Sequence, residues 1–193
     1  MTPSTESNVN KFLKSIELPG LGRTIGDVAQ KADLEVGQKS VKATIELGFP
    51  AATRHAEYRE AIAAALRDET GIDDVEVELS TSIIAHGVQR NLKPMEGVRN
   101  IIAVASGKGG VGKSTVAVNL ALALAADGAS VGLLDADIYG PSVPQMLGLG
   151  GQAPDSKDGK TMLPLEAYGI QAMSIGVLVD ADQPMIWRGP MVT

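Results

Sequence analysis

Cysteine is absent from this chain of 193 residues. The absence excludes disulfides, thiolate nucleophiles and cysteine-ligated metal sites built from these residues alone. Aromatic residues make up only 3% of the chain, so its hydrophobic cores have to be assembled mainly from Ala, Val, Ile and Leu.

Long apolar runs and a positive net charge are also missing. The longest apolar stretch, residues 116–126, is interrupted by Asn119 and is too short to span a bilayer. The first ten residues lack a basic region followed by an apolar core, so they predict no secretory signal. A net charge of -6 argues against nucleic acid as the main partner. We therefore expect a cytoplasmic protein with no membrane and no nucleic-acid partner.

Residues 1–84 predict a small α+β domain. After ten polar residues that we expect to be loose, residues 11–18 carry apolar side chains at helical spacing. Residues 40–47 and 74–80 alternate between apolar and polar, as half-buried strands do, and residues 54–71 between them read as an amphipathic helix. Strand, helix and strand in so short a stretch fit an α+β fold.

Residues 85–97 have no periodicity and predict a linker, after which residues 98–193 follow an α/β pattern. The two continuously apolar stretches 98–106 and 130–138 are expected to be strands, with a helix over 113–128 between them. A Gly- and Pro-rich loop is expected over 139–160 and a further strand over 169–178. This order opens a doubly wound parallel sheet, which needs about five strands or more. We therefore predict the first part of a P-loop domain and an N-terminal portion of a longer protein.

The stretch SGKGGVGKST between the first strand and the helix satisfies the Walker A pattern. Glycines let successive N–H groups turn toward a phosphate, and the helix N-terminus adds partial positive charge. Lys113 then faces the β- and γ-phosphates, Ser114 is placed for Mg²⁺, and Thr115 can reach the α-phosphate. The alternative is a plain glycine turn. The predicted nucleotide-binding residues are Gly107, Lys108, Gly109, Gly110, Val111, Gly112, Lys113, Ser114 and Thr115.

Lys108 stands too early in the loop to reach the γ-phosphate from within it. One interpretation is that it projects outward to the nucleotide of a second subunit, as an arginine finger does. The other is a solvated loop lysine, and its position alone leaves both open.

Asp135 and Asp137 close the strand 130–138, at the carboxyl edge where α/β sheets bind ligands. Their spacing puts both on one side of an extended strand, where carboxylates can hold metal-bound water or orient an attacking water. The alternative is that both acids cap the following loop.

The stretch GKGGVGKST resembles the deviant Walker A motif of the MinD/ParA/ArsA class of ATPases, whose hallmark is the extra lysine. With DIYGPS (137–142) and WRGPM (187–191), residues 98–193 are similar to the Mrp/ApbC branch of iron–sulfur cluster carrier ATPases. Residues 18–25 and the elements after them resemble the iron–sulfur assembly domain that often precedes such ATPases. They depart from its pattern in reading Leu18-Pro19-Gly20 at the usual DPE and in lacking its cysteine.

The resemblance implies an ATP-hydrolysing homodimer that loads iron–sulfur clusters onto apo iron–sulfur proteins, with ATP and Mg²⁺ as cofactors. It gives Lys113 and a partner's Lys108 catalytic roles, makes Asp137 the water-orienting acid, and places Asp135 with Ser114 near the metal. The competing interpretations are a MinD/ParA-like positioning switch and a catalytically incomplete fragment. His55 and His86 are isolated and predict surface or packing roles rather than metal binding.

Overall fold

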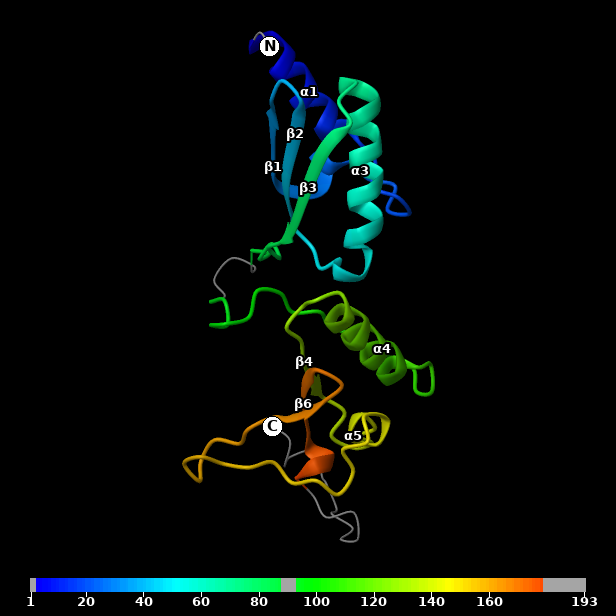
Figure 1. Cartoon of the computed structure of the whole chain (residues 1–193). Coiled ribbons are helices and arrows are strands. Elements are labelled where there is room, and N and C mark those ends of the chain that lie inside the picture. Colours follow the sequence, from blue (N-terminus) through cyan, green and yellow to red (C-terminus); the bar gives the residue numbers. More distant parts are fainter. Residues whose placement is uncertain (1–2, 88–92, 179–193) are drawn as a thin grey trace. The chain divides into compact units, whose positions relative to one another are not determined.

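The computed structural model describes residues 3–87 and 93–178, and the chain divides into two compact units, Met1–Ile101 and Ile102–Thr193. Each unit contains its own small mixed sheet (Figure 1). Each also has its own cluster of buried apolar residues. None of the helices in the described residues is long and apolar enough to cross a bilayer. The two units are described in turn below, each by itself.

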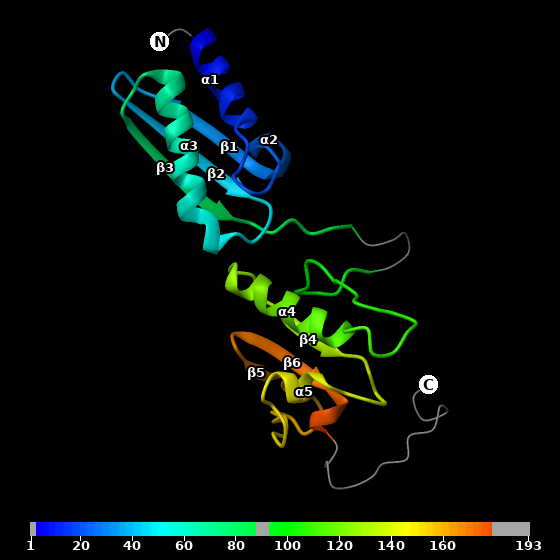
Figure 2. The same cartoon turned by 90° about the vertical axis from the view of Figure 1, so that its right-hand side faces the viewer.

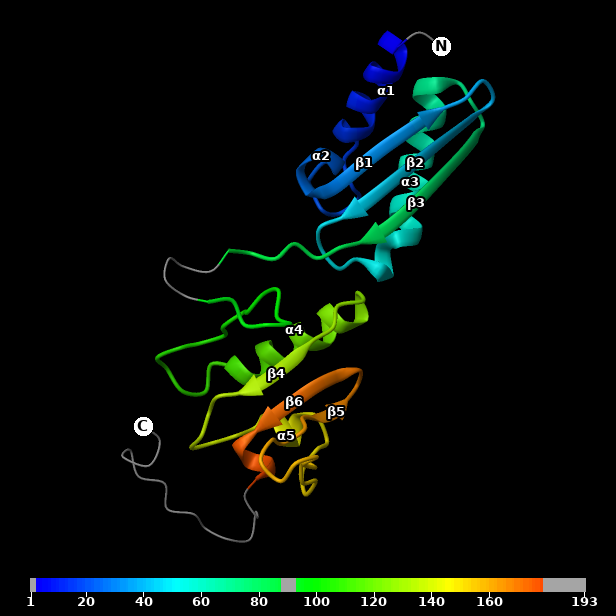
Figure 3. The ribbon, with the colours of Figure 1, turned by 90° about the vertical axis from the view of Figure 1, so that its left-hand side faces the viewer.

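The first unit is an α+β fold with two main helices on one face of a three-stranded sheet (Figures 2 and 3). Strand order is β1-β2-β3, with β1 antiparallel and β3 parallel to the central strand. Along β2, Val41, Ala43, Ile45 and Leu47 are buried against the helices, while the residues between them are half-buried. The elements are α1 (Pro3–Ser15), α2 (Ile25–Val28), β1 (Ala29–Val36), β2 (Ser40–Leu47), a 3₁₀ turn (Ala52–Arg54), α3 (His55–Thr70) and β3 (Asp74–Thr81).

The predicted strand 40–47, helix 54–71 and strand 74–80 are confirmed as β2, α3 and β3 within one residue at each end. The expectation of loose residues before residue 11 was wrong, because α1 already begins at Pro3, and proline is tolerated in the first turn of a helix. Sequence reading also missed β1. Its apolar residues include two alanines, so the alternation with its polar residues is weak.

Arg54 closes the loop that carries Leu18-Pro19-Gly20. Its guanidinium donates to the Pro19 carbonyl at 2.8 Å, pairs with both oxygens of Glu57, and lies over the Tyr58 ring at 5.3 Å from the centroid. Gly20 has a φ of +68°, and a Cβ there would lie 2.9 Å from the guanidinium, so this contact requires glycine. The loop is thus held by the last residue of the 3₁₀ turn that leads into α3.

A side-chain clasp joins the two ends of the predicted linker. The Asn100 side chain accepts from the His86 backbone N–H at 3.0 Å, lies 2.9 Å from His86 Nδ1, and donates to the Ile84 carbonyl at 2.8 Å. Arg99 adds a bond to the Ile83 carbonyl at 3.3 Å. Residues 83–86 and 99–100 are therefore fixed beside each other, on either side of the segment between them.

The second unit is an α/β arrangement in which α4 and α5 pack on one face of a sheet ordered β4-β6-β5 (Figures 2 and 3). β6 is parallel to β4 and antiparallel to β5. Val118 and Ala121 of α4 meet Ile170 and Ala172 of β6 in the core. The elements are α4 (Lys113–Ala126), β4 (Gly132–Asp135), α5 (Val143–Met146), β5 (Leu165–Ala167), β6 (Ile170–Ser174) and a 3₁₀ turn (Ile175–Val177).

The helix predicted over 113–128 is confirmed as α4, and the strands predicted over 130–138 and 169–178 appear as the shorter β4 and β6. The stretch 139–160 was expected to be all loop, but it contains α5, which opens with Pro144 in its first turn. β5 was not foreseen either. It pairs with β6 through a two-residue turn at Tyr168 and Gly169, which both have positive φ.

The strand predicted over 98–106 is wrong for this structure. Those residues adopt no strand, and Ile101 and Ile102 are 73% and 60% exposed. A buried parallel strand needs hydrogen-bonding neighbours and covered faces, and none of the six strands in the described residues pairs with this segment. The segment 98–106 is apolar enough for a buried strand, but neither of the two described sheets pairs with it.

Candidate phosphate-binding site

The loop between residues 106 and 112 is rich in glycine and leads directly into α4. Gly110 and Gly112 have φ of +70° and +87°, a backbone region that side chains other than glycine rarely adopt. A Cβ added at either glycine would meet no atom within 4 Å, so the space around the loop is open. Such a turn gathers successive N–H groups on its inner side, as anion-binding nests do.

Several backbone donors at the start of α4 have no acceptor in the part of the protein that the structure describes. The first helical bond runs from Val116 N–H to the Gly112 carbonyl at 2.9 Å. Gly112 is the N-cap and offers no side-chain oxygen, so among the described residues nothing accepts from the amides of Lys113, Ser114 and Thr115. These donors and the positive end of a 14-residue helix form a site suited to a phosphate.

The two lysines of the loop occupy different environments. Lys113 is the first residue of α4 and is half-buried, whereas Lys108 is exposed on the loop. The Lys108 backbone N–H donates to Ser106 Oγ at 3.1 Å, which closes a tight turn before Gly109. No ion pair involves either ammonium group in the described part of the chain, so both cations are available to an anionic ligand.

Asp135 and Asp137 lie at the carboxyl end of β4, where the sequence placed them. Asp135 is half-buried, and its Oδ1 accepts from the Asp137 N–H at 3.1 Å. Asp137 is exposed, and its Oδ1 accepts from the Gly140 N–H at 3.0 Å. The structure thus brings the two acids together in one turn. In the described residues, no hydrogen bond or ion pair connects them to the glycine loop.

Sequence reasoning missed a third group at this edge, Ser174, at the end of β6. Its Oγ donates to Asp135 Oδ2 at 3.2 Å, and Asp135 is its register partner across the two parallel strands. The Val143 N–H donates to the same carboxylate oxygen at 3.2 Å. The available signal was the position of Ser174 on a predicted parallel strand, whose end has to lie beside that of its neighbour.

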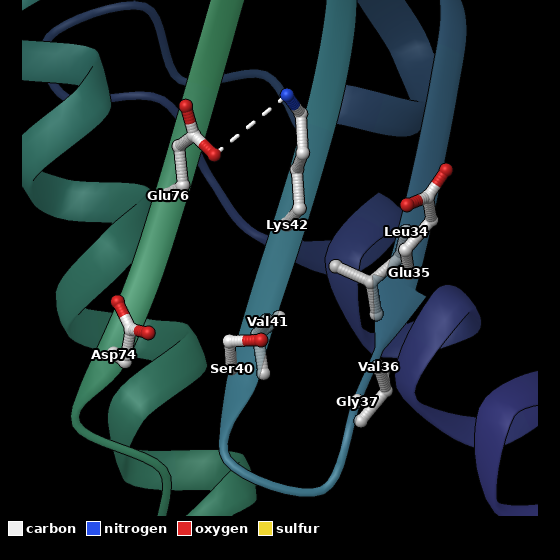
Figure 4. A pocket seen from close by; sticks show the side chains of 9 residues that line it. All are labelled: Leu34, Glu35, Val36, Gly37, Ser40, Val41, Lys42, Asp74 and Glu76. Atoms are coloured by element: carbon white, nitrogen blue, oxygen red, sulfur yellow. Dashed lines mark ion pairs between the residues drawn. The ribbon is translucent and has the colours of Figure 1, made fainter.

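A hollow of about 740 Å³ lies elsewhere, in the first unit, at the β1–β2 hairpin and the start of β3 (Figure 4). On its polar side Lys42 pairs with Glu78 at 2.6 Å and with Glu76 at 3.7 Å. The hydrogen bond that the Lys42 ammonium donates to the Glu78 carboxylate raises the pKa of Lys42 above its ordinary value. With its cation already paired and no phosphate-binding backbone, this hollow is a weaker candidate than the glycine loop. Its lining residues are Leu34, Glu35, Val36, Gly37, Ser40, Val41, Lys42, Asp74 and Glu76.

Metal-ligating side chains are scattered in the described residues, where no three of the His, Cys, Asp and Glu side chains form a group that could hold a metal ion. His55 Nε2 lies 3.4 Å from Thr81 Oγ1, and His86 belongs to the clasp with Asn100. The tail that contains Trp187 and Arg188 lies outside the described residues.

A glycine nest at a helix start, beside acids at the end of a neighbouring strand, is the arrangement of a P-loop nucleotide-binding protein. The family model described as "ParA: NUBPL iron-transfer P-loop NTPase" matches residues 97–193, just over half of the chain. The chain therefore belongs to this family. A second family model, described as iron–sulfur cluster assembly protein, matches residues 6–79.

Relatives with related names cover both units. An iron–sulfur cluster carrier protein from Haemophilus influenzae is 39% identical over 193 residues, which are all of this chain and 52% of the relative. One from Escherichia coli is 53% identical over 71% of this chain and 37% of its own length. The mouse iron–sulfur cluster transfer protein NUBPL is 57% identical over 58% of this chain and 35% of its own length. The chain thus spans about half, or less, of these curated relatives.

Proposed function

We propose that this chain binds and hydrolyses ATP as part of a cytoplasmic homodimer that delivers iron–sulfur clusters to apo iron–sulfur proteins. The observation that carries the nucleotide part is the set of N–H groups at the junction of the glycine loop and α4 that find no acceptor among the described residues. Membership of a P-loop NTPase family supports the same part. The names of the relatives support the role in cluster delivery.

The residues of the loop divide the phosphate contacts among them. The amides of residues 109–115 and the Lys113 ammonium hold the phosphates, and Thr115 reaches the α-phosphate. Water attacks the γ-phosphorus, the bond to the β-γ bridging oxygen breaks, and ADP and phosphate leave. Asp137 orients that water, and the partner subunit's Lys108 offsets the negative charge that develops.

The oxygen atoms present fit a magnesium ion. The Ser114 hydroxyl at the start of α4 is a ligand type that Mg²⁺ accepts, and Asp135 at the end of β4 offers a carboxylate oxygen to the water that the ion would carry. When bound with ATP, Mg²⁺ supplies positive charge at the phosphate oxygens. The cluster is the cargo of the whole protein, and because this chain has no cysteine, these residues supply no thiolate to it.

Two lysine substitutions test the nucleotide site. Lys113→Ala removes the charge beside the phosphates, so we expect MgATP affinity to fall by about 100-fold or more, measured by calorimetry. Lys108→Ala should leave affinity within about threefold and lower turnover on the order of 10³-fold. Lys157→Ala, an exposed lysine away from the loop, is the control and should change neither quantity.

Each outcome bears on a separate part of the proposal. Undiminished affinity in Lys113→Ala would contradict the phosphate assignment. Unchanged turnover in Lys108→Ala would contradict the role of Lys108 across the dimer. Sedimentation with and without MgATP tests the dimer itself, which should form or tighten when nucleotide is present.

A further inference from the structure

Ser174, with 3% of its surface exposed, is the one non-aromatic polar residue among the buried residues that the structure describes. It ends β6 on the face that packs against the helices, in line with Ile170 and Ala172. A buried hydroxyl costs free energy unless it is hydrogen-bonded, so its partners indicate why it is there.

Both hydrogen-bonding functions of this hydroxyl are used. The Gly176 N–H donates to Ser174 Oγ at 3.1 Å, which occupies the acceptor side of the hydroxyl. Its single hydrogen is then directed to Asp135 Oδ2, 3.2 Å away. The turn after β6 thereby fixes the hydroxyl, and the hydroxyl fixes the carboxylate.

The two carboxylate oxygens of Asp135 accept different numbers of hydrogen bonds. Oδ2 accepts from both Ser174 Oγ and the Val143 N–H, which fills its two acceptor positions. Within residues 3–87 and 93–178, Oδ1 accepts only from the Asp137 N–H, which leaves one acceptor position on it. Through these bonds the Asp135 carboxylate, at the end of β4, holds both the start of α5 and the turn that contains Asp137.

We propose that Ser174 is a positioning residue of the phosphate site. It holds Asp135 through Oδ2, so that the free acceptor position of Oδ1 serves the water shell of the magnesium ion that accompanies ATP. Through Asp135 it also keeps Asp137 in its turn. This inference rests on the proposed function, because it assigns Ser174 a part in the same site.

The first test needs no nucleotide. In Ser174→Ala, the amides of Asp137 and Val143 should exchange with deuterium about tenfold faster, because their acceptor is no longer anchored. Asp135→Asn should give a similar increase, and adding Ser174→Ala to it should give little more. Ser174→Thr keeps the hydroxyl and should remain near the wild type, while Ser130→Ala, an exposed serine, is the matched control.

The second test separates positioning from a purely structural role. Ser174→Ala should raise the Mg²⁺ concentration for half-maximal ATP turnover about tenfold, while the KM for ATP at saturating Mg²⁺ changes less than about twofold. The same Mg²⁺ shift should appear in nucleotide binding measured by calorimetry. Ser174→Thr should restore most of the Mg²⁺ dependence.

The outcomes distinguish the two proposals. Faster exchange with an unchanged Mg²⁺ dependence would make Ser174 a structural residue only and overturn the inference. Unchanged exchange, or equal effects of Ser174→Ala and Ser130→Ala, would overturn it as well. If the wild-type protein binds no nucleotide at any Mg²⁺ concentration, the proposed function fails first, and the inference fails with it even where the exchange rates rise.

Discussion

In the first unit, Leu13, Ile45 and Leu66 are completely buried between two helices and a sheet, whereas in the second unit Ile102 and Leu134 are 60% and 73% exposed. In the first unit, α1 precedes the three strands in the sequence and α3 lies between β2 and β3. Together the two helices cover one face of the sheet. The second unit has a sheet of short strands, and the apolar segment 98–106 that leads into it pairs with no strand of the described residues.

This difference shows that a local sequence pattern can form a loop or a helix without forming a closed hydrophobic core. The glycine loop and α4 form even though the segment before them joins neither of the two described sheets, because their geometry depends on local hydrogen bonds and glycine conformations. A core, in contrast, requires partners for each apolar face. The predicted nucleotide site therefore lies in the less completely packed of the two units.

Matched leucine truncations should show the largest difference between the units. Leu66→Ala in the closed core should lower the free energy of unfolding by about 4 kcal/mol, and Leu147→Ala in the second unit by about 2 kcal/mol, because looser surroundings collapse into the space more easily. Urea denaturation gives the free energies, and hydrogen exchange in β2 and β6 follows each unit separately. Equal costs would mean that the second core is packed as well as the first.

A glycine pair gives a smaller contrast. Gly71 ends α3 with a φ of +67°, so Gly71→Ala should cost about 1 kcal/mol of stability. Gly132 in β4 has no positive φ and no atom within 4 Å of an added Cβ, so Gly132→Ala should be nearly neutral. A larger effect at Gly132 than at Gly71 in urea denaturation would contradict the backbone conformations described above.

Ile101 tests the exposed segment directly. At 73% exposure, Ile101→Ser should change the free energy of unfolding by no more than about 0.5 kcal/mol. The buried strand expected from the sequence would instead make this change cost several kcal/mol, about as much as other large apolar truncations in a core. A measured loss of that size would restore the strand over 98–106.

The smallest effect is a local response to pH in the second unit. Bonds from the Thr161 and Lys160 N–H groups to the carboxylate lower the pKa of Asp158 from its ordinary 3.8 to about 2. Because the folded pKa is lower than the unfolded one, this stabilisation is complete above pH 3.8 and is lost as pH falls toward 2. The Thr161 amide chemical shift should titrate in that window, and in Asp158→Asn this transition should disappear.

Sequence reading located the elements whose pattern is local and strong. The alternation at 40–47, the amphipathic repeat ending near Gly71 and the glycine loop before α4 each appear where predicted. Sequence reading failed for β1 and for the segment 98–106. Whether such a segment forms a strand depends on pairing with neighbours that are distant in sequence. At the site, the residue types were readable, but the bond from Ser174 to Asp135 depended on two strands lying in register.

The clasp between Asn100 and the segment at Ile84 and His86 shortens the stretch of chain that can extend before the glycine loop. With residues 83–86 and 99–100 tied together, the free tether before Ser106 shortens to residues 101–105. An extended chain advances about 3.5 Å per residue, so those five residues reach less than about 20 Å.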